Sequence, residues 1–405
     1  MKLKKSPKQI YLDYAATTPV DPRVIKAMQP YWSQDFANPS ALYKSGQRAA
    51  TAIATARADI AKILHCNPRE IIFTAGGTES NNLAILGAAQ AYQKSHHKPG
   101  HIITTPIEHH SVLHTVEALK QWGWKVSFAQ VDETGTVDLA KLKKLVKRDT
   151  AIISVMYANN EIGTIEPIAE IGKWVSGLNK ARSKQKLSPI VFHTDACQAG
   201  GALPLNVTDL KVDLLTLNGS KVYGPKQIGI LYVHTGIQIE PIVHGGGQER
   251  DLRSGTENVP SIVGLATALT LAQKDLAKEN KRLKTLQKYL VDRLSKKVKQ
   301  IKLNGPAVEN NRLANNINLS FDNVEGETLM LYLDNYNIAV ATGSACATAS
   351  LDPSHVLVAI GSNQRDAYSA VRISMGHDTT KASLDYVINV IGELVPMLRK
   401  VKGLR

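Results

Sequence analysis

The chain has 405 residues, of which 43% are hydrophobic and 21% are charged. This length allows a large domain and a smaller one, and the composition excludes general disorder. The formal net charge is +14, no apolar run approaches the length of a membrane span, and the basic N-terminus does not lead into the apolar stretch of a signal peptide. We therefore expect a cytoplasmic globular protein that does not associate with membranes.

Helical and strand patterns alternate between about residues 45 and 235. The expected helices cover residues 47–64, 79–93, 111–122, 139–146 and 168–181. The expected strands cover residues 70–74, 101–105, 125–131, 150–156, 190–193, 214–217 and 228–233. This alternation predicts an α/β fold with a mostly parallel, seven-stranded sheet covered by helices on both faces. Such sheets bind ligands beyond the carboxyl ends of their strands.

The pattern changes in the last third of the chain. Expected strands at 315–321 and 370–374 and expected helices at 326–335 and 382–400 predict a smaller α+β domain. We expect residues 16–260 to form the large domain. Residues 1–15 and 261–405 would form the small one, so the N-terminal segment would pack against the C-terminal part of the chain.

Basic residues are dense between Lys278 and Lys302, where leucines also recur at helical spacing. One interpretation is a long amphipathic helix with a solvated basic face. The other is a surface that attracts acidic proteins or RNA. The chain has no aromatic-rich RNA-binding motif, so we expect no direct nucleic-acid binding.

Two charged residues follow apolar runs that are predicted to be neighbouring strands: Asp195 after the first and Lys221 after the second. An amine and a carboxylate in this arrangement suit pyridoxal 5′-phosphate (PLP). The amine forms a Schiff base with the cofactor, and the carboxylate keeps the pyridine nitrogen protonated, so that the ring acts as an electron sink. Solvated loop residues are the alternative.

A glycine-rich turn, AGGT at residues 75–78, joins the first predicted strand to a helix expected to begin at Glu79. Glycine allows close approach of the backbone, and the start of a helix offers free N–H groups, so this turn suits a phosphate. A plain turn is the alternative. The turn is neither GxGxxG nor a Walker loop, which argues against a dinucleotide or ATP site.

Polar side chains follow other strands of the predicted sheet. His109 could stack on an aromatic ring and move protons near neutral pH, although a structural histidine is the alternative. Asn160 and Gln198 could donate hydrogen bonds to a ring oxygen of the cofactor, whereas asparagine is also an ordinary turn residue.

Cys346 lies in a run of small residues, ATGSACATAS at 341–350, which has no bulky apolar group to bury it. A nucleophilic thiol needs this kind of access. Cys66 and Cys197 are more typical of structural cysteines. The three cysteines form no CxxC pair and no metal-ligand cluster, so we expect a reducing compartment and no metal site.

Nine segments together carry a resemblance to a known family. They are YLDYAATTP (11–19), FTAGGTESNN (73–82), EHH (108–110), NNEIG (159–163), HTDACQ (193–198), NGSKVYGPK (218–226), HGGGQER (244–250), RSGTEN (253–258) and GSAC (343–346). In order and spacing, the chain resembles the cysteine desulfurases of the IscS/NifS type, within the class-V aminotransferase group of fold-type I PLP enzymes.

The resemblance implies roles for individual residues. Lys221 would form the Schiff base, Asp195 would pair with the pyridine nitrogen, and His109 would stack on the ring and take part in acid–base steps. The further cofactor contacts would be Asn160, Gln198, Gly77, Thr78, Ser220, Asn218 and Thr256, the last from the partner subunit of a homodimer. Arg372 would clamp the substrate carboxylate, with Asn38 and Asn160 beside it.

The implied reaction removes sulfur from L-cysteine, leaves L-alanine and places the sulfur on Cys346 as a persulfide. The sulfur would pass to an acceptor protein of iron–sulfur cluster assembly or of tRNA or cofactor thiolation. A selenocysteine lyase, another class-V enzyme or an inert scaffold for sulfur-transfer partners are the alternatives. The chain departs from the family in one place: Asn218-Gly219-Ser220-Lys221 stands where Ser-Gly-His-Lys is common, so the phosphate loses a positively charged neighbour.

Overall fold

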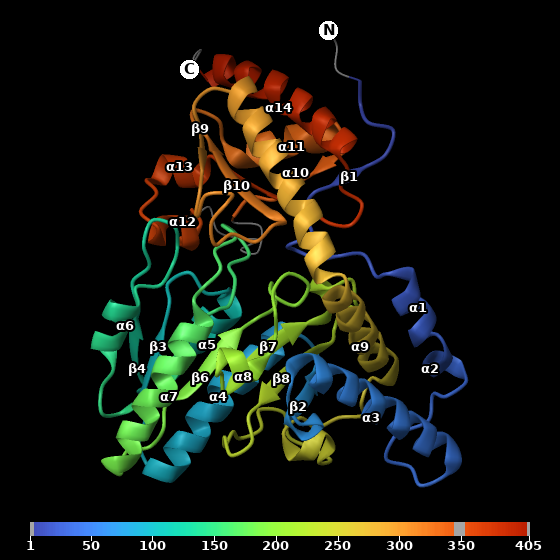
Figure 1. Cartoon of the computed structure of the whole chain (residues 1–405), viewed down its shortest axis with the longest axis vertical. Helices are drawn as coiled ribbons and strands as arrows, with labels where there is room; N and C mark the ends of the chain where they lie inside the picture. The colour runs from blue at the N-terminus through green and yellow to red at the C-terminus, as the bar shows by residue number, and fades with distance from the viewer. Residues whose placement is uncertain (1–3, 344–352, 403–405) are drawn as a thin grey trace.

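The computed structural model describes residues 4–343 and 353–402. Cys346, the predicted nucleophile, lies outside the described residues. The described part of the chain forms a large unit around one wide sheet and a smaller unit that contains the C-terminal helix and the N-terminal segment (Figure 1).

The wide sheet has seven strands, and only one of them runs against its neighbours. Their order is β2 (Ile71–Thr74), β8 (Gly229–Val233), β7 (Leu214–Asn218), β6 (Val191–Asp195), β5 (Thr150–Ser154), β3 (His101–Thr104) and β4 (Lys125–Phe128). β8 is antiparallel to β2 and to β7, and the remaining neighbours pair in parallel. The predicted α/β fold with a mostly parallel seven-stranded sheet is confirmed.

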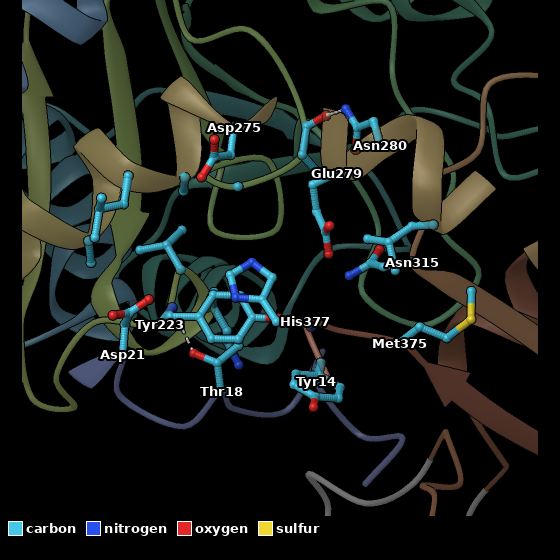
Figure 2. Close-up of a pocket in the computed structure, with 18 of the residues that line it drawn as sticks. Tyr14, Thr18, Asp21, Tyr223, Asp275, Glu279, Asn280, Asn315, Met375 and His377 are labelled. Carbon is cyan, nitrogen blue, oxygen red and sulfur yellow. Dashed lines mark hydrogen bonds between the residues drawn. The ribbon is translucent and has the colours of Figure 1, made fainter. Parts of the chain in front are cut away.

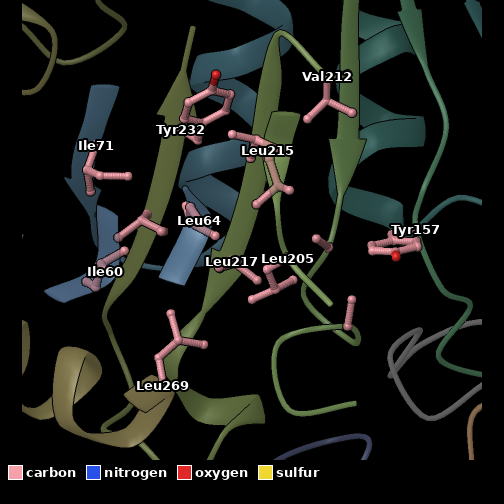
Figure 3. Close-up of a cluster of buried hydrophobic side chains, with 14 of the residues drawn as sticks. Ile60, Leu64, Ile71, Tyr157, Leu205, Val212, Leu215, Leu217, Tyr232 and Leu269 are labelled. Atoms are coloured by element: carbon pink, nitrogen blue, oxygen red, sulfur yellow. The ribbon is translucent and has the colours of Figure 1, made fainter. Parts of the chain in front are cut away.

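Alternate residues of each strand pack against different helices, because successive side chains of a strand point to opposite faces. Ile71 and Phe73 join a cluster with α3 (Lys44–Leu64), α7 (Ile168–Lys184) and α9 (Val259–Lys274). Figure 3 shows part of this cluster, with Leu64 and Leu269 from the helices and Leu217 and Tyr232 from the sheet.

The opposite face of the sheet packs against two other helices. Ile72 joins a second cluster with α4 (Gly77–His96) and α5 (His110–Gln121). Each fully buried leucine, isoleucine or phenylalanine side chain contributes about 1.5–3 kcal/mol to stability. Together the two faces therefore hold the strand ends, and the polar residues that follow them, in fixed positions.

The smaller unit has its own antiparallel sheet, in the order β12 (Ala370–Ser374), β10 (Asn316–Phe321) and β9 (Ile301–Leu303). The N-terminal β1 (Ile10–Tyr11) pairs in parallel with β11 (Ile338–Ala339), and Leu12 lies in the core of this unit. This pairing is consistent with the expected packing of the N-terminal segment against the C-terminal region, and the domain assignment itself stays a proposal. The helices of the unit are α10 (Leu276–Lys297), α11 (Gly326–Asn335), α12 (His355–Ala359), α13 (Gln364–Tyr368) and α14 (Lys381–Lys402).

The leucine-rich stretch divides into two helices at Asp275. α9 buries Leu265 and Leu269 in the core of the large unit, whereas α10 buries Leu290 and Leu294 in the core of the small one. Figure 1 shows α10 running from the large unit to the small one. We propose that the boundary between the domains lies at Asp275 rather than at residue 261.

Further short elements join the sheets: α1 (Pro22–Met28), α2 (Pro30–Ser33), α6 (Leu139–Leu145), α8 (Val207–Leu210) and the 3-10 helices η1 (Pro68–Glu70), η2 (Gly219–Lys221) and η3 (Gln248–Asp251). Within residues 4–343 and 353–402, no helix combines the length and apolar character needed to cross a membrane.

Candidate active site

A cavity of about 200 Å³ lies at the carboxyl edge of the wide sheet, where the small unit meets it. Residues from four strand ends, from the start of α4 and from β12 line it. The predicted site residues among them are Gly77, Thr78, His109, Asn160, Asp195, Gln198, Asn218, Lys221 and Arg372. The wide sheet, α4 and the small unit thus bring together these residues, which are up to 295 positions apart in the sequence.

Asp195 is the last residue of β6 and is only 5% exposed. Its Oδ2 accepts a hydrogen bond from Nδ2 of Asn81 (2.7 Å), and its Oδ1 accepts one from the backbone N–H of Cys197 (2.9 Å). The carboxylate therefore has a fixed orientation. Burial, followed by the charge of Asp195, raises the pKa of the Cys197 thiol well above its usual value, so Cys197 is a poor nucleophile despite lining the cavity.

Lys221 lies in η2, directly after β7. Its Nζ donates hydrogen bonds to the carbonyl oxygens of Ala15 (3.0 Å) and Ala16 (2.5 Å), which follow β1. The N-terminal segment therefore positions the amine at the wall of the cavity. Through Ala15 and Ala16, the N-terminal segment thus takes part in a site whose other residues come mainly from the middle of the chain.

His109 caps the N-terminus of α5 through its own ring. Its Nδ1 accepts a hydrogen bond from the backbone N–H of Ser111 (3.1 Å), and it lies 2.8 Å from the Ser111 hydroxyl. Burial lowers the pKa of His109, and the nearby charge of Asp195 opposes that shift. The ring is therefore neutral at neutral pH, with its proton on Nε2.

Arg372 is a buried charge in β12, with 3% of its surface exposed. Its Nη2 donates to Oδ1 of Asp13 (2.7 Å), and its Nη1 donates to the carbonyl oxygen of Asn160 (3.2 Å). Its Nε is buried and has no hydrogen-bond partner among the residues that the structure describes. A guanidinium that is partly satisfied in this way suits a further acceptor such as a substrate carboxylate.

The start of α4 offers backbone N–H groups to the same cavity, because no side chain caps it. Gly76 has a φ of 145°, which is open to glycine, and a Cβ at Gly77 would lie 2.6 Å from Sγ of Cys197. Both positions therefore require glycine. A free helix start, an oriented carboxylate and a lysine amine around one cavity fit the phosphate, ring nitrogen and aldehyde of PLP.

Three predicted residues lie outside the lining of this cavity. The Ser220 hydroxyl contacts Oδ1 of Asn218 (3.2 Å) and does not line the cavity. Thr256 and Asn38 are exposed and outside the lining, and Oδ1 of Asn38 accepts the N–H of Ser40. Cys346 falls in the part of the chain that is not described. The roles of these residues and of the other predicted site residues stay predictions.

Two supporting residues, Asn81 and Asp13, were given no role by sequence reasoning. Asn81 lies four residues after Gly77, so it occupies the same side of α4 as the glycine-rich turn. This four-residue spacing could have predicted that Asn81 faces the cavity. Nothing in the sequence indicated that Asp13 would meet Arg372, since 359 residues separate them.

A second cavity, of about 70 Å³, adjoins the first between the two units (Figure 2). Gln198 and Lys221 line both cavities. The ring of His377 stacks on Tyr223, with 3.7 Å between the ring centroids, and the backbone N–H of Tyr223 donates to Oγ1 of Thr18 (2.8 Å). Tyr223, two residues after Lys221, therefore ties η2 to both units.

No group of three or more metal-binding side chains suitable for an ion occurs among the residues that the structure describes.

Comparison with known proteins places the chain in one family. Residues 10–387 match the family model described as Aminotransferase class-V. The chain is 44% identical over 397 residues to a protein named "Cysteine desulfurase IscS" from Clostridium botulinum (98% of this chain, 97% of the relative). It is 45% identical over 394 residues to one of the same name from Dictyoglomus turgidum (97% and 96%). A solved structure titled "NIFS-LIKE PROTEIN" has a TM-score of 0.87 at 37% identity, covering 96% of this chain and 100% of its own.

Proposed function

Because the chain belongs to the class-V aminotransferase family, we propose that it is a PLP-dependent cysteine desulfurase that carries the sulfur of L-cysteine as a persulfide on Cys346. One observation carries the proposal: Lys221, Asp195 and Arg372 line a single cavity. An amine and a carboxylate for the cofactor thus lie beside a guanidinium for an amino-acid carboxylate.

Bound PLP would supply an electron sink that weakens bonds near the α-carbon of the substrate. Lys221, Asp195 and the start of α4 would hold it, and Arg372 would bind the substrate carboxylate. The amine of Lys221 and Nε2 of His109 would move protons at the substrate carbons. Because the neutral His109 ring carries its proton on Nε2, that nitrogen can donate a proton to the substrate as well as orient the ligand.

Sulfur transfer needs a second nucleophile, and Cys346 supplies it in this proposal. Its thiolate forms a bond to the substrate sulfur as the Cβ–S bond breaks. The electron pair of the broken bond stays with the carbon skeleton, which gains a proton and leaves as alanine. No external oxidant or reductant is needed, because the two electrons that the two sulfur atoms lose on forming the S–S bond are gained by the β-carbon, which becomes the methyl group of alanine.

The active unit is a homodimer in this proposal. Large apolar side chains are exposed on α1, α2 and the segment that follows: Ile25, Trp32, Phe36 (72%), Leu42 (90%) and Tyr43. Exposed apolar groups of this size, close in sequence, are typical of an interface. Thr256 is also exposed and would reach the phosphate in the partner's cavity. Light scattering of the purified protein gives the oligomeric state directly.

The sulfur would pass to an acceptor protein of iron–sulfur cluster assembly or tRNA thiolation in a reducing compartment, which we take to be the cytoplasm. Free thiols at Cys66 and Cys197 support a reducing location. Trapping of radiolabelled sulfur from the persulfide on co-purified proteins identifies the acceptor.

A substitution of the nucleophile tests the proposed function. Cys346→Ser leaves Lys221, Asp195 and His109 intact, so the variant should bind PLP and change its visible absorbance when L-cysteine is added. It should form no alanine, because a hydroxyl is too weakly acidic to attack sulfur. Cys66→Ser is the matched control and should keep full activity, since burial raises the pKa of Cys66 to about 12. Alanine formation by Cys346→Ser at the wild-type rate would refute the proposal.

A further inference from the structure

Glu161 is a buried carboxylate next to the active-site cavity to which no role has been given above. It follows Asn160 and is 5% exposed. The side-chain oxygen of Asn159 accepts hydrogen bonds from the backbone N–H groups of Glu161 (2.8 Å) and Ile162 (3.0 Å). The carbonyl oxygen of Glu161 accepts a hydrogen bond from Asn318 of β10 (3.2 Å). The backbone that carries this carboxylate is therefore held from both units.

The carboxylate of Glu161 meets two segments of the chain at one point. The hydroxyl of Ser354 donates a hydrogen bond to its Oε2 (2.5 Å). A Cβ placed on Gly343 would lie 2.6 Å from the same Oε2 and 2.8 Å from Cβ of Ser354. Gly343, Glu161 and Ser354 are thus in such close contact that only glycine fits at position 343. In the sequence, Gly343 and Ser354 flank the stretch that contains Cys346.

Further contacts attach the same two flanks to the active site. Before the stretch, Ala341 exchanges two backbone hydrogen bonds with Arg372 (3.1 and 2.7 Å). After it, Nε2 of His355 lies 2.9 Å from the carbonyl oxygen of Glu108, the residue before His109. These contacts attach the flanks to the neighbours of the predicted substrate and cofactor contacts, and Glu161 is the side chain that both flanks share.

We infer that Glu161 is a positioning residue for sulfur transfer, which sets where Gly343 and Ser354 lie relative to the cofactor cavity. The inference rests on the proposed function, because it presumes that Cys346 accepts the sulfur. Cys346 is three residues beyond Gly343, so a fully extended backbone takes it at most about 10–11 Å from that anchor. A displacement of the anchor therefore changes the reach of the thiol directly, and an error of about 1 Å in a reacting group can cost about 100-fold in rate.

The electrostatics of Glu161 agree with this role. Burial raises the pKa of Glu161 to about 7, and the Ser354 hydrogen bond and the positive charge of Arg372 oppose that shift. Above that pH the carboxylate is ionised and accepts the Ser354 hydrogen bond in its stronger, charge-assisted form. The contact between the two flanks is thus firmest at neutral to alkaline pH.

The test compares Glu161→Gln and Ser354→Ala with the control Glu166→Gln. Glu166 is also buried, burial raises its pKa to about 8, and it accepts the backbone N–H of Val137 rather than a group from either flank. Each variant is loaded with PLP, its thermal midpoint and PLP content are measured, and it is mixed rapidly with L-cysteine. Two rates are followed: the change in visible absorbance and the appearance of protein-bound persulfide.

For Glu161→Gln and Ser354→Ala we expect an unchanged absorbance rate, an unchanged KM for L-cysteine and persulfide formation that is roughly 10- to 100-fold slower. Glu166→Gln should match the wild type in both rates. Equal slowing of both rates, or no slowing of either, overturns the inference. If Glu161→Gln loses PLP or does not fold, Ser354→Ala decides, because it keeps the carboxylate. Wild-type protein that forms no persulfide on Cys346 contradicts the proposed function instead.

Discussion

The two halves of the proposed chemistry are built in different ways. The cofactor half is formed by strand ends of the wide sheet, and most of its groups have a close partner: Asp195 bonds to Asn81, His109 to Ser111, and Lys221 to Ala15 and Ala16. The sulfur half depends on Cys346, which lies outside the described residues, and in the inference above the described residues that flank its stretch position it. The sheet can therefore fix the first half with its core, while the second needs its own anchors, such as the contact of Ser354 with Glu161.

The largest effect is expected from Lys221→Ala, a substitution that disables only the cofactor half of the chemistry. Lys221→Ala deletes the amine that would hold PLP and move protons, so turnover should fall to background, and the visible absorbance of covalently bound cofactor should disappear. Folding should be retained, because Lys221 is not part of a hydrophobic core. Absorbance spectra and an alanine assay check this, and wild-type turnover by the variant would show that the lysine is misassigned.

A smaller effect on the same half is expected from His109. Burial lowers its pKa, so the neutral ring persists to a pH below the usual value near 6.5. The cysteine-dependent absorbance change should therefore slow only as the pH falls below about 6.5, and this step precedes the one that involves Glu161.

His109→Gln should slow that absorbance change by roughly 10²- to 10⁴-fold and remove its dependence on acid pH. Stopped-flow spectra from pH 5 to 8 give both results. An acid limb that survives in the variant would assign the titration to another group.

The smallest effect is expected from Thr256→Ala, which tests whether Thr256 contacts the PLP of the partner subunit. Thr256→Ala should weaken PLP binding roughly 10- to 100-fold, which is the usual cost of one hydrogen bond to a charged group. In a mixed dimer of Thr256→Ala and Lys221→Ala subunits, the subunit that keeps Lys221 receives an intact Thr256 from its partner. Half of the sites should then bind PLP with wild-type affinity. Weak binding at every site would place Thr256 in its own subunit's cavity, whereas unchanged PLP binding by the Thr256→Ala homodimer would place it outside the site.

The sequence predicted the wide sheet well because its strands are apolar and are separated by helices of regular period. It predicted the boundaries less well where a local contact decides them. α4 begins at Gly77 rather than Glu79, since the glycines allow the helix to start against Cys197. The helical spacing of the leucines continues on both sides of Asp275, so it did not indicate that the helix ends there. α9 and α10 both bury leucines, although they do so in different cores.

The same distinction applies to the candidate site. Residues that stand directly after apolar runs, such as Asp195 and Lys221, were predictable from position, and Arg372 was predictable as a charge inside an apolar strand. The partners of these residues were not. Asp13 meets Arg372 because the N-terminal segment packs against β12 within the small unit, and Glu161 meets Ser354 through the docking of the two units. Periodicity carries no information on either contact.

The most direct test of the central claim is to map the sulfur after one turnover. Wild-type protein loaded with PLP is mixed with one equivalent of L-cysteine, quenched with an alkylating agent and digested. The mass of each cysteine-containing peptide is determined by mass spectrometry, and alanine is measured in the same sample. We predict one alanine for each persulfide, with the added sulfur on the Cys346 peptide. Sulfur on the Cys66 or Cys197 peptide, or alanine formed without any protein-bound sulfur, would contradict the account.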